Sequence, residues 1–159
     1  MTPVELRTIL EYNPSTGAIQ NKKTKRYLQP DHDGLVTIFH KKSYKMKLER
    51  IAYTLAFGKE PGKDKKVLHK NLDISDNSLD NLSLVTRRIF LQIKEAHKNL
   101  TQSIRLSAHP TDQFSYIVHW IENNHDKQKV VYDLAAARQV MLKLQLKYSK
   151  ILTKYCVFD

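Results

Sequence analysis

The stretch from residue 67 to residue 86 reads VLHKNLDISDNSLDNLSLVT and decides how the chain can fold. It opens with a short apolar run that ends at His69, and such a run is typical of a buried strand. Residues 71–77 are rich in Asn, Asp and Ser, which favour turns because their side chains bond to nearby backbone groups. Residues 78–85 are expected to start a helical segment. The stretch therefore predicts a strand, a polar loop and a helix, with a histidine at the end of the strand.

The residues before this stretch predict several small elements. Thr2, Pro3 and Glu5 form a helix start of the capping-box type, so a short helix is expected over residues 2–12. Residues 13–17 have the composition of a turn. Alternating and then helically spaced apolar side chains follow. They predict strands at 18–23, 34–41 and 43–48, and a helix at 48–58.

The residues after the stretch predict a basic helix and then a unit made of a sheet and a helix. The basic helix is expected over residues 87–100. Asn-rich residues at 123–126 form a hairpin turn between two strand-like runs, and Asp133 is a suitable N-cap for a long amphipathic helix. The strands are expected at 103–110, 113–122 and 127–133, and the long helix at 134–152. The predicted fold class is α+β, with domains at 1–86 and 104–159 and a basic connecting helix at 87–103.

Composition narrows the classes of function. The 159 residues carry 27 Lys and Arg against 16 Asp and Glu, a formal net charge of +11. Such an excess favours a polyanion as partner, above all nucleic acid, through phosphate contacts. One cysteine, Cys156, excludes an internal disulfide and a multi-cysteine zinc site, and four glycines are too few for a Gly-rich phosphate loop. No apolar run is long enough for a membrane span and no signal peptide opens the chain, so a cytoplasmic protein is expected.

The first hundred residues resemble the HNH homing endonucleases of phages, which have the ββα-metal fold. The similarity lies in the order and spacing of short motifs. The longest is the run from His69 to Leu82, which matches the family's pattern H-I-N-G-D-x-x-D-N-R-I-E-N-L without a gap. The shorter motifs are YNPSTG at 12–17, DGL at 33–35, RIAY at 50–53, FGKEP at 57–61 and LVT at 84–86. The resemblance implies an HNH-like domain over residues 1–86.

The tail, from about residue 104 onward, is similar to the small DNA-binding domain of plant ethylene-response factors, which is also found attached to phage HNH nucleases. That domain has three strands followed by one helix, and its sheet enters the major groove. The similarity lies in the pattern of strands and helix and in Trp120 on the middle strand. An alternating strand allows Trp120 either to pack in the core or to face DNA.

The first resemblance also implies a catalytic site. His69 would be the general base that activates water, Asn81 would orient the loop, and Asn77 belongs to the same candidate site. The family's metal ligands stand directly before the histidine and nine residues after the position of Asn81; this chain has Leu68 and Phe90 there. Neither side chain can coordinate a hard cation, so no metal is expected. Mg²⁺ or Mn²⁺ would be the cofactor if the nuclease site were functional.

Three explanations of the two apolar residues stay open. Cleavage has been lost while DNA binding is kept, or an altered metal site uses Asp73 or Asp76 with His69, or the register is shifted at Phe90. The two Asp side chains also suit a purely structural role as caps of the turn. The mismatch at Leu68 does not depend on the register, because Leu68 adjoins His69.

The leading hypothesis is a sequence-specific double-stranded DNA-binding protein that derives from an HNH homing endonuclease, no longer cleaves, and regulates transcription as a repressor or competes for a DNA site. The alternatives are an active HNH homing endonuclease or nickase with an atypical metal site, and an inhibitor that uses the nuclease fold to bind a protein partner. The residues expected on phosphates are Lys22, Lys23, Lys25, Arg26, Lys41, Lys42, Lys45, Arg87 and Arg88. The residues expected to read bases are Arg105, Tyr116, His119, Trp120, Lys127 and Lys129.

Overall fold

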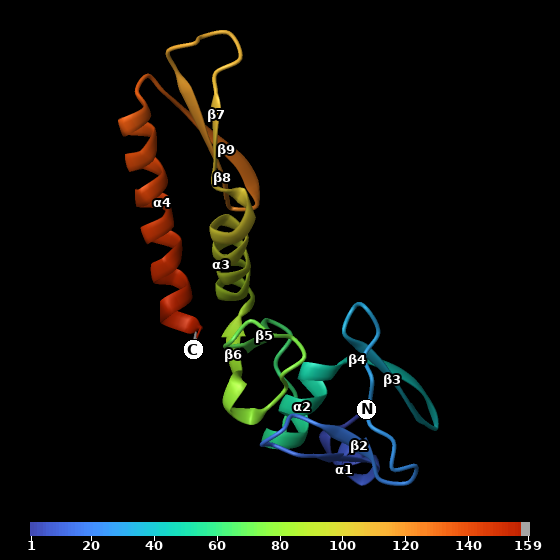
Figure 1. Cartoon of the computed structure of the whole chain (residues 1–159). Coiled ribbons are helices and arrows are strands. Elements are labelled where there is room, and N and C mark those ends of the chain that lie inside the picture. Colours follow the sequence, from blue (N-terminus) through green and yellow to red (C-terminus); the bar gives the residue numbers. More distant parts are fainter. Residues whose placement is uncertain (157–159) are drawn as a thin grey trace. The chain divides into compact units, whose positions relative to one another are not determined.

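The computed structural model describes residues 1–156 and has a mixed α+β architecture (Figure 1). The chain forms two compact units that divide after Arg87, and each unit is described by itself. Within residues 1–156, no helix combines the length and the apolar character that a membrane crossing requires. Helix α3 (Arg87–Lys98) begins at the division, so all but its first residue are grouped with the second unit.

The first unit is built from hairpins and two helices. Strands β1 and β2, β3 and β4, and β5 and β6 form two-stranded antiparallel sheets. The expected strands and the helix around residues 48–58 are confirmed; β2 and β3 are shorter than expected, β4 has the expected length shifted by one residue, and β5 begins two residues earlier than expected. The elements are α1 (Pro3–Ile9), β1 (Leu10–Tyr12), β2 (Ile19–Asn21), β3 (Leu35–His40), β4 (Lys42–Lys47), α2 (Leu48–Phe57), β5 (Lys65–His69), the 3-10 turn η1 (Leu79–Asn81) and β6 (Leu82–Thr86).

Two of the expected helices are wrong in part. The helix expected over residues 2–12 ends at Ile9, because the next residues pair with β2 as strand β1. The helical segment expected over residues 78–85 is confined to η1, because the residues after it pair with β5 as strand β6. In both places a ladder with a distant strand outweighs local spacing that also suits a helix. The capping box is confirmed, since the Glu5 N–H donates to Thr2 Oγ1 at 3.2 Å and the Thr2 N–H donates to the Glu5 carboxylate at 2.7 Å.

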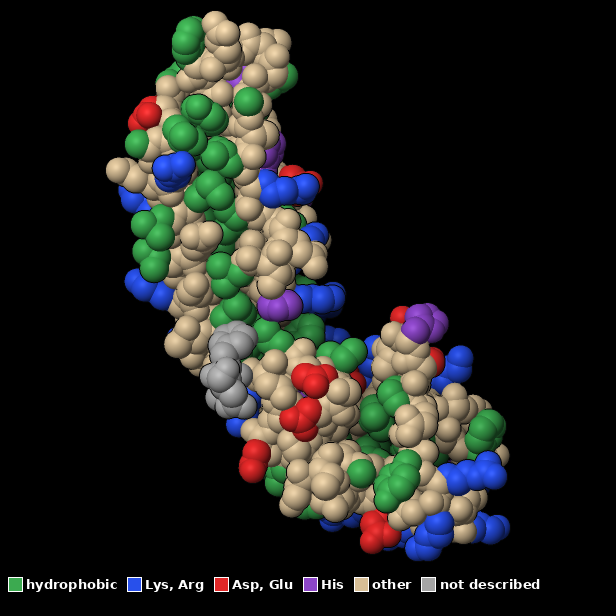
Figure 2. Space-filling view, in the orientation of Figure 1, with side chains coloured by type: hydrophobic (Ala, Val, Ile, Leu, Met, Phe, Trp, Pro, Cys, Tyr) green, Lys and Arg blue, Asp and Glu red, His purple; other side chains and the backbone are tan. Residues whose placement is uncertain are grey.

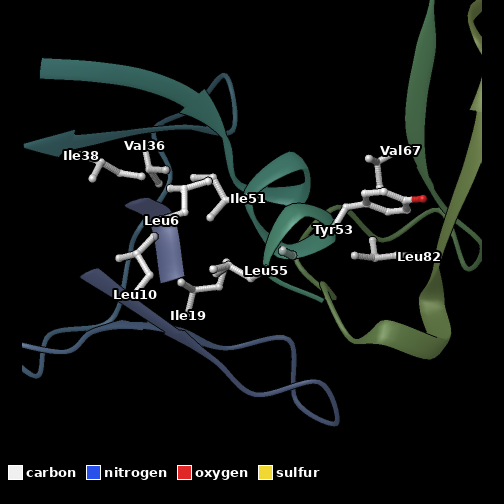
Figure 3. Close-up of a cluster of buried hydrophobic side chains, with 11 residues drawn as sticks. Leu6, Leu10, Ile19, Val36, Ile38, Ile51, Tyr53, Leu55, Val67 and Leu82 are labelled. Carbon is white, nitrogen blue, oxygen red and sulfur yellow. The ribbon is translucent and has the colours of Figure 1, made fainter. Parts of the chain in front are cut away.

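Helix α2 forms the centre of the hydrophobic core of the first unit (Figure 3). Ile51 and Leu55 point from one side of the helix toward apolar side chains of α1, β1, β2 and β3. Tyr53 points from the other side and lies between Val67 of β5 and Leu82 of β6. The partners of the first side are Leu6, Leu10, Ile19, Val36 and Ile38. One helix therefore ties the N-terminal strands to the β5–β6 hairpin.

The second unit is a three-stranded antiparallel sheet with one long helix packed on it (Figure 1). The strands and helix expected in this part of the chain are confirmed, and Asp133 caps the helix by accepting a hydrogen bond from the Ala136 N–H at 3.1 Å. Asn123 and Asn124 both have positive φ, as a two-residue hairpin turn requires. After α3 come the π-helical turn η2 (Asn99–Ser103), β7 (Arg105–Ala108), β8 (Tyr116–Glu122), β9 (His125–Val131) and α4 (Leu134–Tyr155).

A second core lies between this sheet and α4. Val118 is fully buried in a cluster with Val131 and Ala137. Trp120 is on the same face of β8 as Val118, because side chains alternate along a strand, and it packs against this cluster. Of the two orientations that the sequence allowed for Trp120, the structure has the one in the core.

The backbone of Ile121 joins three elements of the second unit. The Asn99 side chain bonds both of its backbone groups, donating to the Ile121 carbonyl at 2.7 Å and accepting from the Ile121 N–H at 2.7 Å. The Tyr148 hydroxyl donates to the same carbonyl at 2.7 Å. Asn99 and Tyr148 are each 1% exposed, so water cannot replace these hydrogen bonds. Together they hold η2, β8 and α4 in one arrangement.

Replacing Tyr148 by Phe should make the second unit less sensitive to alkaline pH. Burial raises the pKa of Tyr148 to about 12, whereas the pKa of tyrosine in an unfolded chain is about 10. The unfolded state therefore loses its proton first. The stabilisation is fully present well below pH 10 and is lost as the pH rises from about 10 toward 12, so about 2 kcal/mol should be gone by about pH 11.5. Urea unfolding followed by the fluorescence of Trp120 measures this loss.

Tyr132→Phe is the matched control, because Tyr132 is 78% exposed. The alkaline loss should persist in Tyr132→Phe and shrink in Tyr148→Phe. Equal losses in the two variants would contradict the assignment of the alkaline transition to the buried hydroxyl.

Candidate functional site

The β5–β6 hairpin places His69 at the end of β5, opposite Leu82. Directly opposed residues share a face of an antiparallel pair, so His69 lies on the face that packs toward α2. The preceding residue, Leu68, is opposite Ser83 and points to the other face. His69 is 7% exposed and Leu68 is 4% exposed. The hairpin therefore buries both side chains, on opposite faces.

A hydrogen bond to Asn77 fixes the His69 ring. His69 Nε2 lies 3.2 Å from Asn77 Oδ1. The Asn77 amide nitrogen donates to the Ser75 carbonyl at 3.3 Å, which identifies the other amide atom as the oxygen. An amide oxygen only accepts, so Nε2 carries the proton in this bond. Of the two ring nitrogens, Nδ1 is then the one that a neutral His69 can use as a base.

The carboxylates of the loop between the two strands are engaged by the loop itself. Asp73 accepts hydrogen bonds from the Ser75 N–H at 2.9 Å and from the Ser75 hydroxyl at 2.6 Å. Asp76 accepts from the Ser78 N–H at 3.0 Å and from the Asn71 amide at 3.0 Å. These hydrogen bonds lower the pKa of Asp73 and the pKa of Asp76, so both are charged at neutral pH. The structure thus gives both residues a role as caps of the turn.

Asn81 closes the loop from its far end. Its side-chain carbonyl accepts from the Asn71 N–H at 2.9 Å, and its amide donates to the Asp76 carbonyl at 2.7 Å. Its backbone carbonyl also accepts from the Lys70 N–H at 2.8 Å. Asn81 is 8% exposed. One asparagine therefore bonds three points of the loop, as a residue that orients the loop would.

The turn at residues 13–17 braces the same loop from outside, which the sequence did not reveal. The Tyr12 hydroxyl donates to the Asn77 carbonyl at 2.8 Å, and the Leu79 N–H donates to the Pro14 carbonyl at 2.8 Å. Gly17 has φ +74°, and a Cβ built on it would stand 2.4 Å from the Asn77 carbonyl carbon. The YNPSTG motif was visible in the sequence, but its contact with residues 77–79 is long-range.

The donor groups at this site do not fit a hard divalent cation. Such ions need oxygen ligands, chiefly carboxylates. Leu68 supplies none, and the carboxylates of Asp73 and Asp76 already accept hydrogen bonds within the loop. Across residues 1–156, no three His, Cys, Asp or Glu side chains gather in a way that could hold an ion. Phe90 lies in α3, which is grouped with the second unit, and it is half-buried.

The cations expected on phosphates in the first unit are exposed and lie in two segments. One is the turn after β2, and the other is the tip of the β3–β4 hairpin with the strand that follows. Figure 1 shows both at the same end of the unit, and Figure 2 shows Lys and Arg side chains gathered there. The Lys22 ammonium is also bonded to the Arg7 carbonyl at 2.6 Å. The first segment holds Lys22, Lys23, Lys25 and Arg26, and the second Lys41, Lys42 and Lys45.

The remaining candidates fall on different surfaces. Arg87 and Arg88 are exposed at the start of α3, on either side of the division between the units. Arg105 is paired with His119 and shares its face, where the Ser107 hydroxyl lies 3.0 Å from His119 Nε2. The strand pairing puts four other candidates, two aromatic residues and two lysines, on the face of the sheet that α4 covers. The two lysines are nevertheless exposed. These four are Tyr116, Trp120, Lys127 and Lys129. The candidates for base reading are thus not brought together on one face.

Replacing Gly17 by Ala should loosen the loop that holds His69. The new Cβ would meet the backbone of Asn77 and Ser78, and the positive φ adds strain for any residue with a Cβ. We expect a loss of about 2 to 4 kcal/mol in the free energy of unfolding. Hydrogen exchange of the amides of residues 71–81 should also become faster.

Gly62→Ala is the control for that change. A Cβ on Gly62 would meet only side-chain atoms, the nearest being Asp64 Oδ1 at 3.0 Å, which can move aside. Its stability should stay within about 0.5 kcal/mol of the wild type. Equal effects of the two substitutions would show that the contact of Gly17 with residues 77–78 does not hold the loop.

Comparison with known proteins bears on the segment that contains this site. Residues 47–90 match a protein-family model described as HNH endonuclease. The match spans α2, the β5–β6 hairpin and the start of α3, and it includes His69, Asn77 and Asn81. No match was found among curated proteins or among solved structures. Residues 47–90 therefore form an HNH endonuclease-type segment, which as an active enzyme would be a metal-dependent nuclease.

Proposed function

We propose that this chain is a double-stranded DNA-binding protein that derives from an HNH homing endonuclease and no longer cleaves DNA. On this proposal it occupies a DNA site as a repressor or as a competitor of other proteins, inside the cell. The observation that carries the proposal is the contrast at the β5–β6 hairpin. The frame of an HNH site is present, while the position before His69 is a buried leucine.

The loop contacts support this proposal because side chains of the loop itself hold its backbone. The side chains of Asn71, Asp73, Asp76 and Asn81 satisfy the backbone of the loop. The His69 ring is fixed by Asn77. A site held in this way keeps its shape when the ligands for an ion are replaced.

The charge distribution supports the choice of DNA as partner. Residues 1–100 carry 19 Lys and Arg against 11 Asp and Glu, and residues 101–159 carry 8 against 5. Phosphate contacts by such cations release counterions, so affinity falls steeply as salt rises. Two basic units on one chain would also raise the effective concentration of each at a composite DNA site.

The test of DNA binding is fluorescence anisotropy with a labelled duplex of mixed sequence over a series of salt concentrations. We expect a linear fall of the logarithm of the affinity with the logarithm of the salt concentration. Replacing Lys23 and Arg26 together by Gln should reduce the magnitude of that slope by about 2.

The matched control replaces Lys143 and Lys150 of α4 by Gln, which removes the same charge from exposed positions outside the proposed contacts. Its slope should stay close to that of the wild type. If the wild-type protein bound the duplex weakly and its affinity did not change with salt concentration, the proposal would be contradicted.

One observation keeps an active nuclease as the second candidate. His69 is one of the groups that lower the pKa of Asp73, so the two side chains are within electrostatic reach of each other and a site that combines them is the alternative. Incubation with supercoiled and linear DNA in Mg²⁺ or Mn²⁺ separates the candidates. We expect no cleavage; nicking that His69→Ala abolishes would establish the nuclease and overturn the loss of cleavage.

A further inference from the structure

The β3–β4 hairpin is a ribbon with two different faces. Val36 and Ile38 are each 3% exposed and belong to the core of the first unit. Residues between and beyond them point the opposite way because side chains alternate along a strand. On that outer face Phe39 is paired with Ser43, next to the tip of the ribbon.

Phe39 is largely exposed, and the packing of the first unit does not cover it. Its side chain is 78% exposed, although burying a phenylalanine side chain stabilises a folded protein. Tyr53 and Phe57 pack ring against ring elsewhere in the unit, with their planes tilted by 34°, whereas within residues 1–156 no aromatic ring packs on Phe39 in this way. A large ring left in water at a ribbon tip is the side chain that an external partner could cover.

The charges around Phe39 indicate what kind of partner that is. Residues 35–47 contain four lysines and no Asp or Glu. Lys41 occupies the tip with φ +59°, and the Lys42 ammonium lies 5.2 Å from the centre of the Tyr44 ring. Within residues 1–156, neither Lys41, Lys42 nor Lys45 forms an ion pair.

Two acidic side chains lie near the ribbon, one of them within electrostatic reach of a residue that adjoins its tip. Glu5 is within electrostatic reach of His40, and Asp31 is within reach of Lys45. The Lys47 ammonium bonds the Asp33 carbonyl and is thereby tied to the loop before β3. Positive charge thus lies beside the exposed ring, with Lys41 at the tip and Lys45 on the face of the ribbon that carries Phe39, and this arrangement complements a partner with phosphates and stacked bases.

We propose that the tip of the β3–β4 ribbon enters the minor groove of duplex DNA and that Phe39 inserts there as a wedge at a base step, with Lys41 at the tip and Lys45 on the same face as Phe39 contacting the flanking phosphates. This inference rests on the proposed function and names the residue through which the first unit would deform its target. Two-stranded ribbons can bind in the minor groove, and apolar side chains inserted there at a base step partly unstack the bases and kink the duplex.

The first test compares Phe39→Ala with Phe114→Ala in the full chain. Phe114 is a matched control, because it is 73% exposed and residues 106–126 contain no Lys or Arg. Anisotropy with a labelled duplex should show an affinity about tenfold lower for Phe39→Ala, as expected when an aromatic contact with bases is lost. The salt slope should be unchanged, because no phosphate contact is removed. Phe114→Ala should bind like the wild type.

The second test measures the deformation itself. A duplex that carries a donor dye at one end and an acceptor dye at the other should show higher fluorescence energy transfer when the wild type binds, because bending brings its ends closer. At saturating protein concentration, Phe39→Ala should produce little of that increase. A Phe39→Trp variant should keep the affinity and show fluorescence quenching on binding that exceeds the quenching in the wild type, whose one tryptophan is Trp120.

The outcomes separate the wedge from the proposed function. If the wild type does not bind the duplex in a salt-dependent way, both fail. If it does, but Phe39→Ala matches Phe114→Ala in affinity and energy transfer, the wedge alone is overturned. If Phe39→Ala lowered the affinity only for single-stranded oligonucleotides, the wedge would also be overturned, because the ring would then stack on unpaired bases.

Discussion

Burial on two sides of helix α2 is the constraint on which the first unit depends. Ile51 and Leu55 pack toward the N-terminal elements, while Tyr53 packs between the strands of the β5–β6 hairpin. The strands formed by residues 1–87 pair two by two, and an isolated hairpin is marginally stable in water. The hairpins are therefore ordered because each reaches α2, and the position of His69 follows from the burial of Tyr53 against Val67 and Leu82.

Local signals in the sequence predicted the elements whose stability is itself local. The capping box at Thr2, the cap at Asp133 and the turn at Asn123 and Asn124 are formed by neighbours along the chain, and all are present. The strand β6 was mistaken for a helix because its apolar residues suit either structure. Only its pairing with β5, more than ten residues earlier in the chain, decides between them.

The candidate site shows the same difference between local and long-range contributions. The ordered run from His69 to Leu82 made the loop, Asn77 and Asn81 visible in the sequence. The contacts that position them come from Tyr12, Pro14 and Gly17, some sixty residues away in the chain, and no local pattern announces such contacts. Likewise the bonds of Asn99 and Tyr148 to Ile121 unite three elements through side chains that looked ordinary in the sequence.

The side chains that cap the loop after β5 have a consequence for how such a protein changes over evolutionary time. Asn71, Asp73, Asp76 and Asn81 satisfy backbone groups of the loop, so substitutions there reduce stability whatever the function of the chain. Position 68 has no such bond to the loop and can drift under different selection. The residues that make this motif recognisable are thus the record of a folding requirement, and a lineage can carry them unchanged through a change of activity.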